Sequence, residues 1–203
     1  MAEKKIGTKA KKKIKKGFFE VEVPLTAAVV KLYAGDAGEL DGRTVKLDLT
    51  KSLRGKSLEL KLKVKAEEGK LKGEPMSLVL VGSYVRRMMR KGADYVEDSF
   101  DTNCRDMKVR VKPFLITRKK VSRAVRGVLR EGARKYLVGY FKTRNVRELF
   151  NEIINNKLQK SLSLKLKKIY PLALCEIRWF EVVGERDAVE EEFEDEEEKE
   201  EIR

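Results

Sequence analysis

RDMKVRVKPFLITRKKVSRAVRGVLREGARKY, residues 105–136, changes at Thr117 from an alternating pattern to a helical one. Before Thr117 apolar residues alternate with polar ones, which predicts a strand with one buried face. After it, valine and leucine recur at spacings of three and four, which predicts an amphipathic helix. We expect Val109, Val111, Phe114 and Ile116 of the strand in the core, and the apolar face of the helix consists of Val121, Val125, Val128 and Leu129.

The same stretch carries twelve Lys or Arg residues and only two Asp or Glu residues. Like charges at this density repel one another unless a polyanion neutralises them. The charges available to phosphate are those on the outer pleat of the strand and those of the turn and helix after Thr117. We therefore expect a nucleic-acid contact centred on residues 118–130.

Further elements are predicted on both sides of this stretch. Apolar runs predict strands at 18–23, 44–49, 58–64, 76–81, 95–101 and 172–183. Ser83 can cap a short helix over 84–91, Ser122 can cap the helix after Thr117, and Asn145 with Glu148 resembles a capping box. Residues 161–169 fit a strand by alternation and a helix by spacing, so both remain open.

Strands joined mainly by hairpins, with a helical pair before the last strand, predict an α+β fold. We expect a small antiparallel β-barrel or sandwich with helices inserted before a final strand. The domain organisation expected is a basic disordered arm over 1–17, one α+β RNA-binding domain over 18–184, and an acidic disordered tail over 185–203.

The net charge of +14 conceals a separation of opposite charges along the chain. Residues 185–203 hold twelve acidic and three basic residues, a net of −9, so residues 1–184 carry +23. The basic arm either lies along phosphates or only keeps the protein soluble. The acidic tail is either a solvated terminus or a polyanion that competes with nucleic acid.

The sequence contains no assembled catalytic or metal site. Histidine is absent, and no phosphate-binding loop, nucleophile elbow or zinc-ligand spacing occurs. The carboxylates at Asp94, Glu97, Asp98 and Asp101 are spread over a predicted strand, and Cys104 and Cys175 are expected to be buried thiols. We therefore expect no enzymatic activity and no cofactor, and a soluble protein without a membrane span.

Binding residues are better supplied, in three basic clusters. Arginine forks grip phosphates in bidentate fashion, and lysines add mobile point charges. The alternative for any single cluster is a solvated helix face. The candidate RNA-binding residues are Lys11, Lys12, Lys13, Lys15, Lys16, Arg86, Arg87, Arg90, Lys91, Arg118, Lys119, Lys120, Arg123, Arg126 and Arg130. Because no base-reading motif appears, recognition of phosphate and shape in folded RNA fits best.

Five motifs together resemble a family of small-subunit ribosomal proteins, S-three-A-e or eS-one, found in archaea and eukaryotes. They follow a lysine-rich arm in a fixed order, and the resemblance runs from about 18 to 182. The motifs are FFEVEVP at 18–24, DGRTVKLDLTKSL at 41–53, SYVRRMMRKGADYVEDSFDT at 83–102, KVRVKPFLITRKK at 108–120 and IYPL at 169–172.

This resemblance implies a structural constituent of the small ribosomal subunit in the cytoplasm. It implies a place on the platform near the messenger exit channel, with ribosomal RNA, neighbouring ribosomal proteins and messenger RNA as partners. It also implies a β-barrel-like body, and it favours a helix over 161–169. The alternative is a free RNA-binding or RNA-chaperone protein acting off the ribosome.

Overall fold

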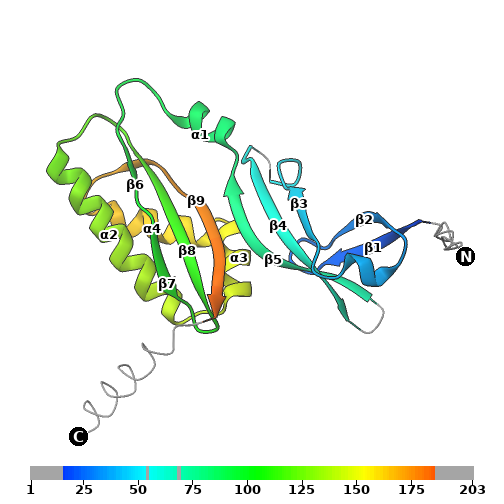
Figure 1. The fold of residues 1–203 in the computed structure, drawn as a ribbon. Helices are drawn as coiled ribbons and strands as arrows, with labels where there is room; N and C mark the ends of the chain where they lie inside the picture. The colour runs from blue at the N-terminus through cyan, green and yellow to red at the C-terminus, as the bar shows by residue number, and fades with distance from the viewer. Residues whose placement is uncertain (1–15, 54, 68–69, 186–203) are drawn as a thin grey trace, which may run out of the picture.

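The computed structural model describes residues 16–53, 55–67 and 70–185, and the chain within these ranges forms nine strands and four α-helices (Figure 1). Most of the predicted basic arm and nearly all of the acidic tail, including Lys11, Lys12, Lys13 and Lys15, lie outside the described residues.

The first part of the fold is a set of hairpins. β1 (Gly17–Val23) pairs with β2 (Ala28–Ala34), and β3 (Thr44–Asp48), preceded by the short 3-10 helix η1 (Ala37–Leu40), pairs with β4 (Leu58–Glu67). β4 in turn pairs along its length with β5 (Lys70–Leu80). β4 buries the face that its alternating pattern predicted: Leu58, Leu60, Leu62 and Val64 are all buried.

The second part combines strands with helices. After α1 (Gly82–Met88) come β6 (Tyr95–Glu97), β7 (Phe100–Asn103) and β8 (Met107–Thr117). Three helices follow, α2 (Arg123–Lys142), α3 (Val146–Ile154) and α4 (Lys157–Leu166), and the chain then returns as β9 (Leu172–Glu185) between β5 and β8. The α+β class and the insertion of helices before a final strand are confirmed.

The strands form one open sheet, where closure into a barrel or sandwich was expected. β5 is the bridge between the two parts. One of its edges pairs with β1 in parallel at Val21↔Leu71, and further along the same edge it pairs with β9 at Val79↔Trp179. The sheet is open because its end strands, β2 in the first part and β6 in the second, do not pair with each other (Figure 1).

The main core lies between the second part of the sheet and the helices. Leu129, Ala133, Leu137 and Phe141 of α2 are fully buried at helical spacing. The ring of Phe180 on β9 lies 4.9 Å from that of Phe150 on α3 and 5.9 Å from that of Phe141. A smaller cluster under β1, β2 and η1 contains Leu40 and Val64.

Several predicted details differ in the structure. The strand expected over 95–101 is two strands that pair with β8 in the same register, interrupted at Asp98 and Ser99, where the Asp98 carboxylate accepts from the Ser99 N–H at 3.0 Å. Ser83 does not cap α1, which begins one residue earlier, and Asn145 makes no side-chain cap bond to α3. The Ser122 cap is confirmed by a hydrogen bond from the Val125 N–H, and residues 161–169, left open between strand and helix, lie largely in α4.

Within the described residues, no helix is both long enough and apolar enough to cross a membrane.

Candidate nucleic-acid interface

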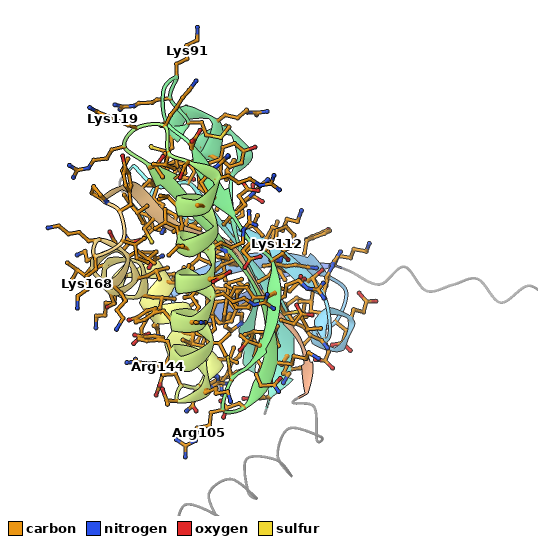
Figure 2. The ribbon with its side chains drawn as sticks, turned by 90° about the vertical axis from the view of Figure 1, so that its left-hand side faces the viewer. Lys91, Arg105, Lys112, Lys119, Arg144 and Lys168 are labelled. Atoms are coloured by element: carbon orange, nitrogen blue, oxygen red, sulfur yellow. The ribbon has the colours of Figure 1, made fainter. Side chains whose placement is uncertain are left out.

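Two of the predicted basic clusters lie at the same end of the molecule. Tyr95, the first residue of β6, pairs with Ile116 at the end of β8. This register places the turn that holds Arg90 and Lys91 beside the turn that begins at Arg118. Figure 2 shows Lys91 and Lys119 at the same end, above the start of α2.

Asp94 and Thr117 bind the two turns together. The Thr117 N–H donates to the Asp94 carbonyl at 2.9 Å, and the Thr117 hydroxyl accepts from the Asp94 N–H at 3.0 Å. The Asp94 carboxylate accepts from the Val121 N–H at 2.9 Å. Because Thr117 is fully buried, these bonds form away from competing water. They hold Arg118, Lys119 and Lys120 in a defined turn.

The cluster on α1 faces outwards. Tyr84 and Val85 are buried, whereas Arg86, Arg87, Arg90 and Lys91 are exposed. The guanidinium of Arg87 lies 6.0 Å from the centre of the Tyr84 ring, which restricts where that cation can point. Arg86 and Arg87 thus lie on α1 opposite its buried residues, whereas Arg90 and Lys91 lie in the turn after this helix, which was expected to continue to Lys91 but ends at Met88.

The start of α2 is electropositive for two reasons. Its first turn contains no acidic residue to offset the positive end of the helix dipole. Arg123 and Arg130 are exposed, and Arg126 is half-buried, with its Nε atom buried and without a hydrogen-bond partner among the described residues. Arg123 and Arg130 can reach a bound phosphate, whereas Arg126 is less accessible than the sequence suggested.

Lys16 is the one candidate residue of the basic arm that the structure describes. It is exposed, and it lies just before β1, at the other end of the sheet (Figure 1).

The outer pleat of β8 is less available than expected. Arg110 donates to both carboxylate oxygens of Asp101, at 2.7 and 2.9 Å, and this pairing lowers the pKa of Asp101 below its usual value. Lys112 lies 5.2 Å from the centre of the Trp179 ring. These partners could not be read from the sequence, since Asp101 and Trp179 come from neighbouring strands.

Each acidic residue considered for catalysis has another structural role. Glu97 accepts from Arg178 at 2.7 Å, Asp98 accepts from the Ser99 N–H at 3.0 Å between β6 and β7, and Asp94 positions the basic turn. No cluster of three or more Cys, Asp or Glu within the described ranges could hold a metal ion. Burial raises the pKa of the Cys104 and Cys175 thiols to about 12, so both thiols remain protonated at neutral pH.

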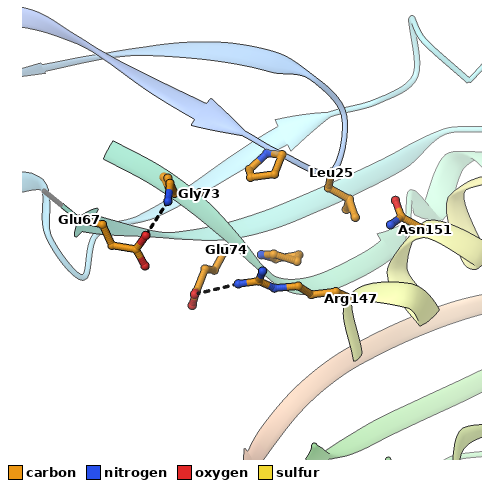
Figure 3. Close-up of a pocket in the computed structure, with 9 residues that line it drawn as sticks. Leu25, Glu67, Gly73, Glu74, Arg147 and Asn151 are labelled. Carbon is orange, nitrogen blue, oxygen red and sulfur yellow. Dashed lines mark hydrogen bonds and ion pairs between the residues drawn. The ribbon is translucent and has the colours of Figure 1, made fainter. Parts of the chain in front are cut away.

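A cavity of about 480 Å³ lies where the β4–β5 hairpin approaches α3 (Figure 3). Its charged side chains are paired: Lys72 with Glu67 at 2.7 Å, and Arg147 with Glu74 at 3.6 Å. Internal neutralisation leaves this cavity without a net charge to attract a polyanion.

A second basic surface was missed by the sequence reasoning. A groove of about 740 Å³ runs between α2 and α4, and it is lined by Lys135, Tyr136, Tyr140, Arg144, Lys165 and Lys168. Figure 2 shows Lys168 on one side of α2 and Lys112 on the other. The sequence indicated this surface only through the lysines at the end of residues 161–169. Which face these lysines occupy depended on whether the segment is a strand or a helix, and the sequence left that open.

Comparison with known proteins shows the family to which this chain belongs. The small ribosomal subunit protein eS1 of Nanoarchaeum equitans is 31% identical over 117 residues, covering 57% of this chain and 59% of that protein. The protein of the same name from Methanothrix thermoacetophila is 26% identical over 160 residues, covering 74% of each. The match therefore spans about three fifths of the first relative's length. The model of the Ribosomal S3Ae family matches residues 4–186, so the chain belongs to that family.

Proposed function

We propose that this protein is a structural constituent of the small ribosomal subunit and binds ribosomal RNA through its basic end. The observation that carries the proposal is the family match over residues 4–186, together with relatives named as small ribosomal subunit proteins. The protein acts as a cytoplasmic RNA-binding scaffold in translation and not as an enzyme.

The joined basic clusters support the RNA-binding part of the proposal. The turn with Arg90 and Lys91 lies beside the turn with Arg118, Lys119 and Lys120, and Arg86 and Arg87 precede it on α1. No side chain of these two clusters makes an ion pair within the described residues. Seven unpaired cations at one end can follow the phosphates of a folded RNA and release its counterions.

The same proposal includes the position and organisation of the protein. Residues 18–184 form one RNA-binding domain, and residues 1–17 and 185–203 are the basic arm and the acidic tail. The protein lies on the platform near the messenger exit channel, where neighbouring ribosomal proteins and messenger RNA come within reach. The resemblance of the five sequence motifs to the family supports this position.

Quantitative recovery from fractionated cells tests the proposal. A ribosomal constituent should sediment with small subunits at about one copy each and dissociate only at high salt. Recovery of most of the protein in the ribosome-free fraction would instead favour a free RNA-binding or chaperone function.

Directed cleavage of RNA tests the interface within the intact subunit. An iron chelate attached at Lys119→Cys should cut ribosomal RNA nearby, whereas the same reagent at Lys63→Cys on β4 serves as the control. The two native cysteines are buried and should not take up the reagent. Equal cleavage patterns from both positions would show that the basic end is not the RNA contact.

A further inference from the structure

The groove between α2 and α4 combines stacked aromatic rings with unpaired cations. The rings of Tyr136 and Tyr140 are stacked with centres 5.7 Å apart, and the Arg144 guanidinium lies 4.3 Å from the centre of the Tyr140 ring. Tyr136 and Tyr140 are four positions apart on α2, and Arg144 follows just after the end of this helix at Lys142, so the contacts form one column in the order Tyr136, Tyr140, Arg144.

The inner part of this column is fixed in place. The Tyr140 hydroxyl donates to Glu152 of α3 at 2.9 Å, and Arg144 pairs with the same carboxylate. Burial and this hydrogen bond raise the pKa of Tyr140 to about 12. Tyr136, at the other end of the column, has no such anchor among the described residues, so its ring is the one placed to receive a ligand.

Charge complementarity indicates the nature of that ligand. Lys135, Lys165 and Lys168 line the groove, and none of them makes an ion pair within the described ranges. Among the residues that the structure describes, no Asp or Glu lines the groove. The charge of the groove therefore favours a polyanion. The aromatic column also offers a surface on which unpaired bases can stack, and the bases of a duplex are not free to do so.

The floor of the groove is open at Gly139. A side chain built at that position would meet no atom within 4 Å, whereas one at Gly132 would meet Ile169 at 3.1 Å and Leu166 at 3.3 Å. Gly132 thus lets α4 approach α2 closely, and Gly139 leaves space between them. The volume of about 740 Å³ falls within the range of about 300–1,000 Å³ usual for ligand sites.

We propose that this groove binds single-stranded RNA, with a base stacked on Tyr136 and phosphates bound by Lys135, Lys165 and Lys168. The inference deepens the proposed RNA-binding function and adds a second contact, separate from the basic end near Lys119. The basic end takes phosphates of folded RNA, and the groove takes an unpaired segment of it.

Substitution of Gly139 in the full chain tests the groove proposal without changing the charge of the protein. Gly139→Leu should fill the floor and reduce affinity for a single-stranded oligouridine by about tenfold, the loss expected for one unstacked base. Gly139→Ala is the matched control and should bind as the unaltered protein does. Tyr136→Leu should match the Gly139→Leu loss, which guards against a folding defect of either variant.

Three results would overturn the groove proposal. One is unchanged oligouridine binding by both Gly139→Leu and Tyr136→Leu. Another is an equal loss for a blunt RNA duplex, which would mean that no unpaired base is recognised. The third is a loss confined to a peptide of residues 185–203, which would assign the groove to an acidic protein segment. The duplex separates the groove proposal from the proposed function. If the protein binds the duplex and Arg118→Gln/Lys119→Gln weakens this binding, the proposed function stands even though the groove proposal fails. If the protein shows no saturable binding to any RNA, both proposals fail.

Discussion

The Nζ atom of Lys56 lies 2.5 Å from Oε2 of Glu176, although 120 residues separate them in the chain. Both side chains are buried, and Nζ also donates to Asn156 at 2.7 Å. The loop before β4 is thus joined to β9 and to the start of α4. Glu176 further raises the pKa of Tyr84, after the larger effect of burial, so α1 lies close to the same charge.

Removing one charge of this pair should strongly destabilise the fold. Lys56→Met leaves the buried Glu176 carboxylate without its cationic partner, with only the Gln159 amide 3.5 Å away, and should lower the free energy of unfolding by about 3–5 kcal/mol. Urea denaturation followed by circular dichroism measures it. Lys31→Met is the control: its partner Glu20 is 3.3 Å away, both side chains are exposed, and the loss should be under about 1 kcal/mol. Similar losses for the two variants would contradict the burial argument.

Two substitutions of Asp94 distinguish the effect of its anchoring of the basic turn from the effect of its negative charge. Both Asp94→Ala and Asp94→Asn make the protein more positive, so electrostatics alone predicts tighter RNA binding by each. Only asparagine can still accept from the Val121 N–H. We expect Asp94→Ala to weaken binding severalfold because the turn at Arg118 loses its anchor, and Asp94→Asn to bind at least as tightly as the unaltered protein. The affinity of each variant for RNA is measured by filter binding at fixed salt. Tighter binding by the alanine variant would show that the turn needs no anchor.

Salt dependence should report how many phosphates the basic end binds. Arg118→Gln/Lys119→Gln should reduce the slope of log affinity against log salt by about 0.7–0.9 for each phosphate that the variant no longer neutralises. Lys46→Gln/Lys63→Gln on β3 and β4 removes the same charge at a distance from that end. If the two double variants change the slope equally, binding depends on net charge and not on a defined site.

Stability should fall above about pH 9 because of the buried thiols. The folded thiols of Cys104 and Cys175 keep their protons up to a pKa of about 12, whereas those of the unfolded chain lose them near pH 9. The unfolded state then binds fewer protons, so the free energy of unfolding decreases as pH rises through this window. Urea midpoints between pH 8 and 10 should fall less steeply for Cys104→Ala/Cys175→Ala; parallel curves would rule out the thiols as the cause.

Two glycines of α2 should respond in opposite directions to alanine. Alanine favours a helix over glycine by up to about 1 kcal/mol, so Gly139→Ala, in open space, should raise the melting temperature. At Gly132 the new methyl would press on Leu166, which is fully buried, and overpacking of this kind costs roughly 1–3 kcal/mol. Gly132→Ala should therefore melt lower. A rise for both variants would mean that α4 can move away freely.

Much of the fold followed from local pattern. The change of period at Thr117, the Ser122 cap and the buried alternation of β4 each depend on neighbouring residues, so they were readable before any tertiary contact was known. Predictions failed at two points: the strand over 95–101 is interrupted at Asp98 and Ser99, and the sheet stays open because its end strands β2 and β6, which lie far apart in the chain, do not pair with each other.

What the sequence by itself determined is which residues are basic, which faces are apolar and which family's motifs are present. Only the tertiary structure decided which cations remain available. It joined the clusters at Lys91 and Lys119 through the pairing of β6 with β8, neutralised Arg110 with Asp101, and set Tyr136 beside Lys165 in a groove. Charge is a property of single residues, whereas availability to phosphate depends on neighbours that the chain brings together only when it folds.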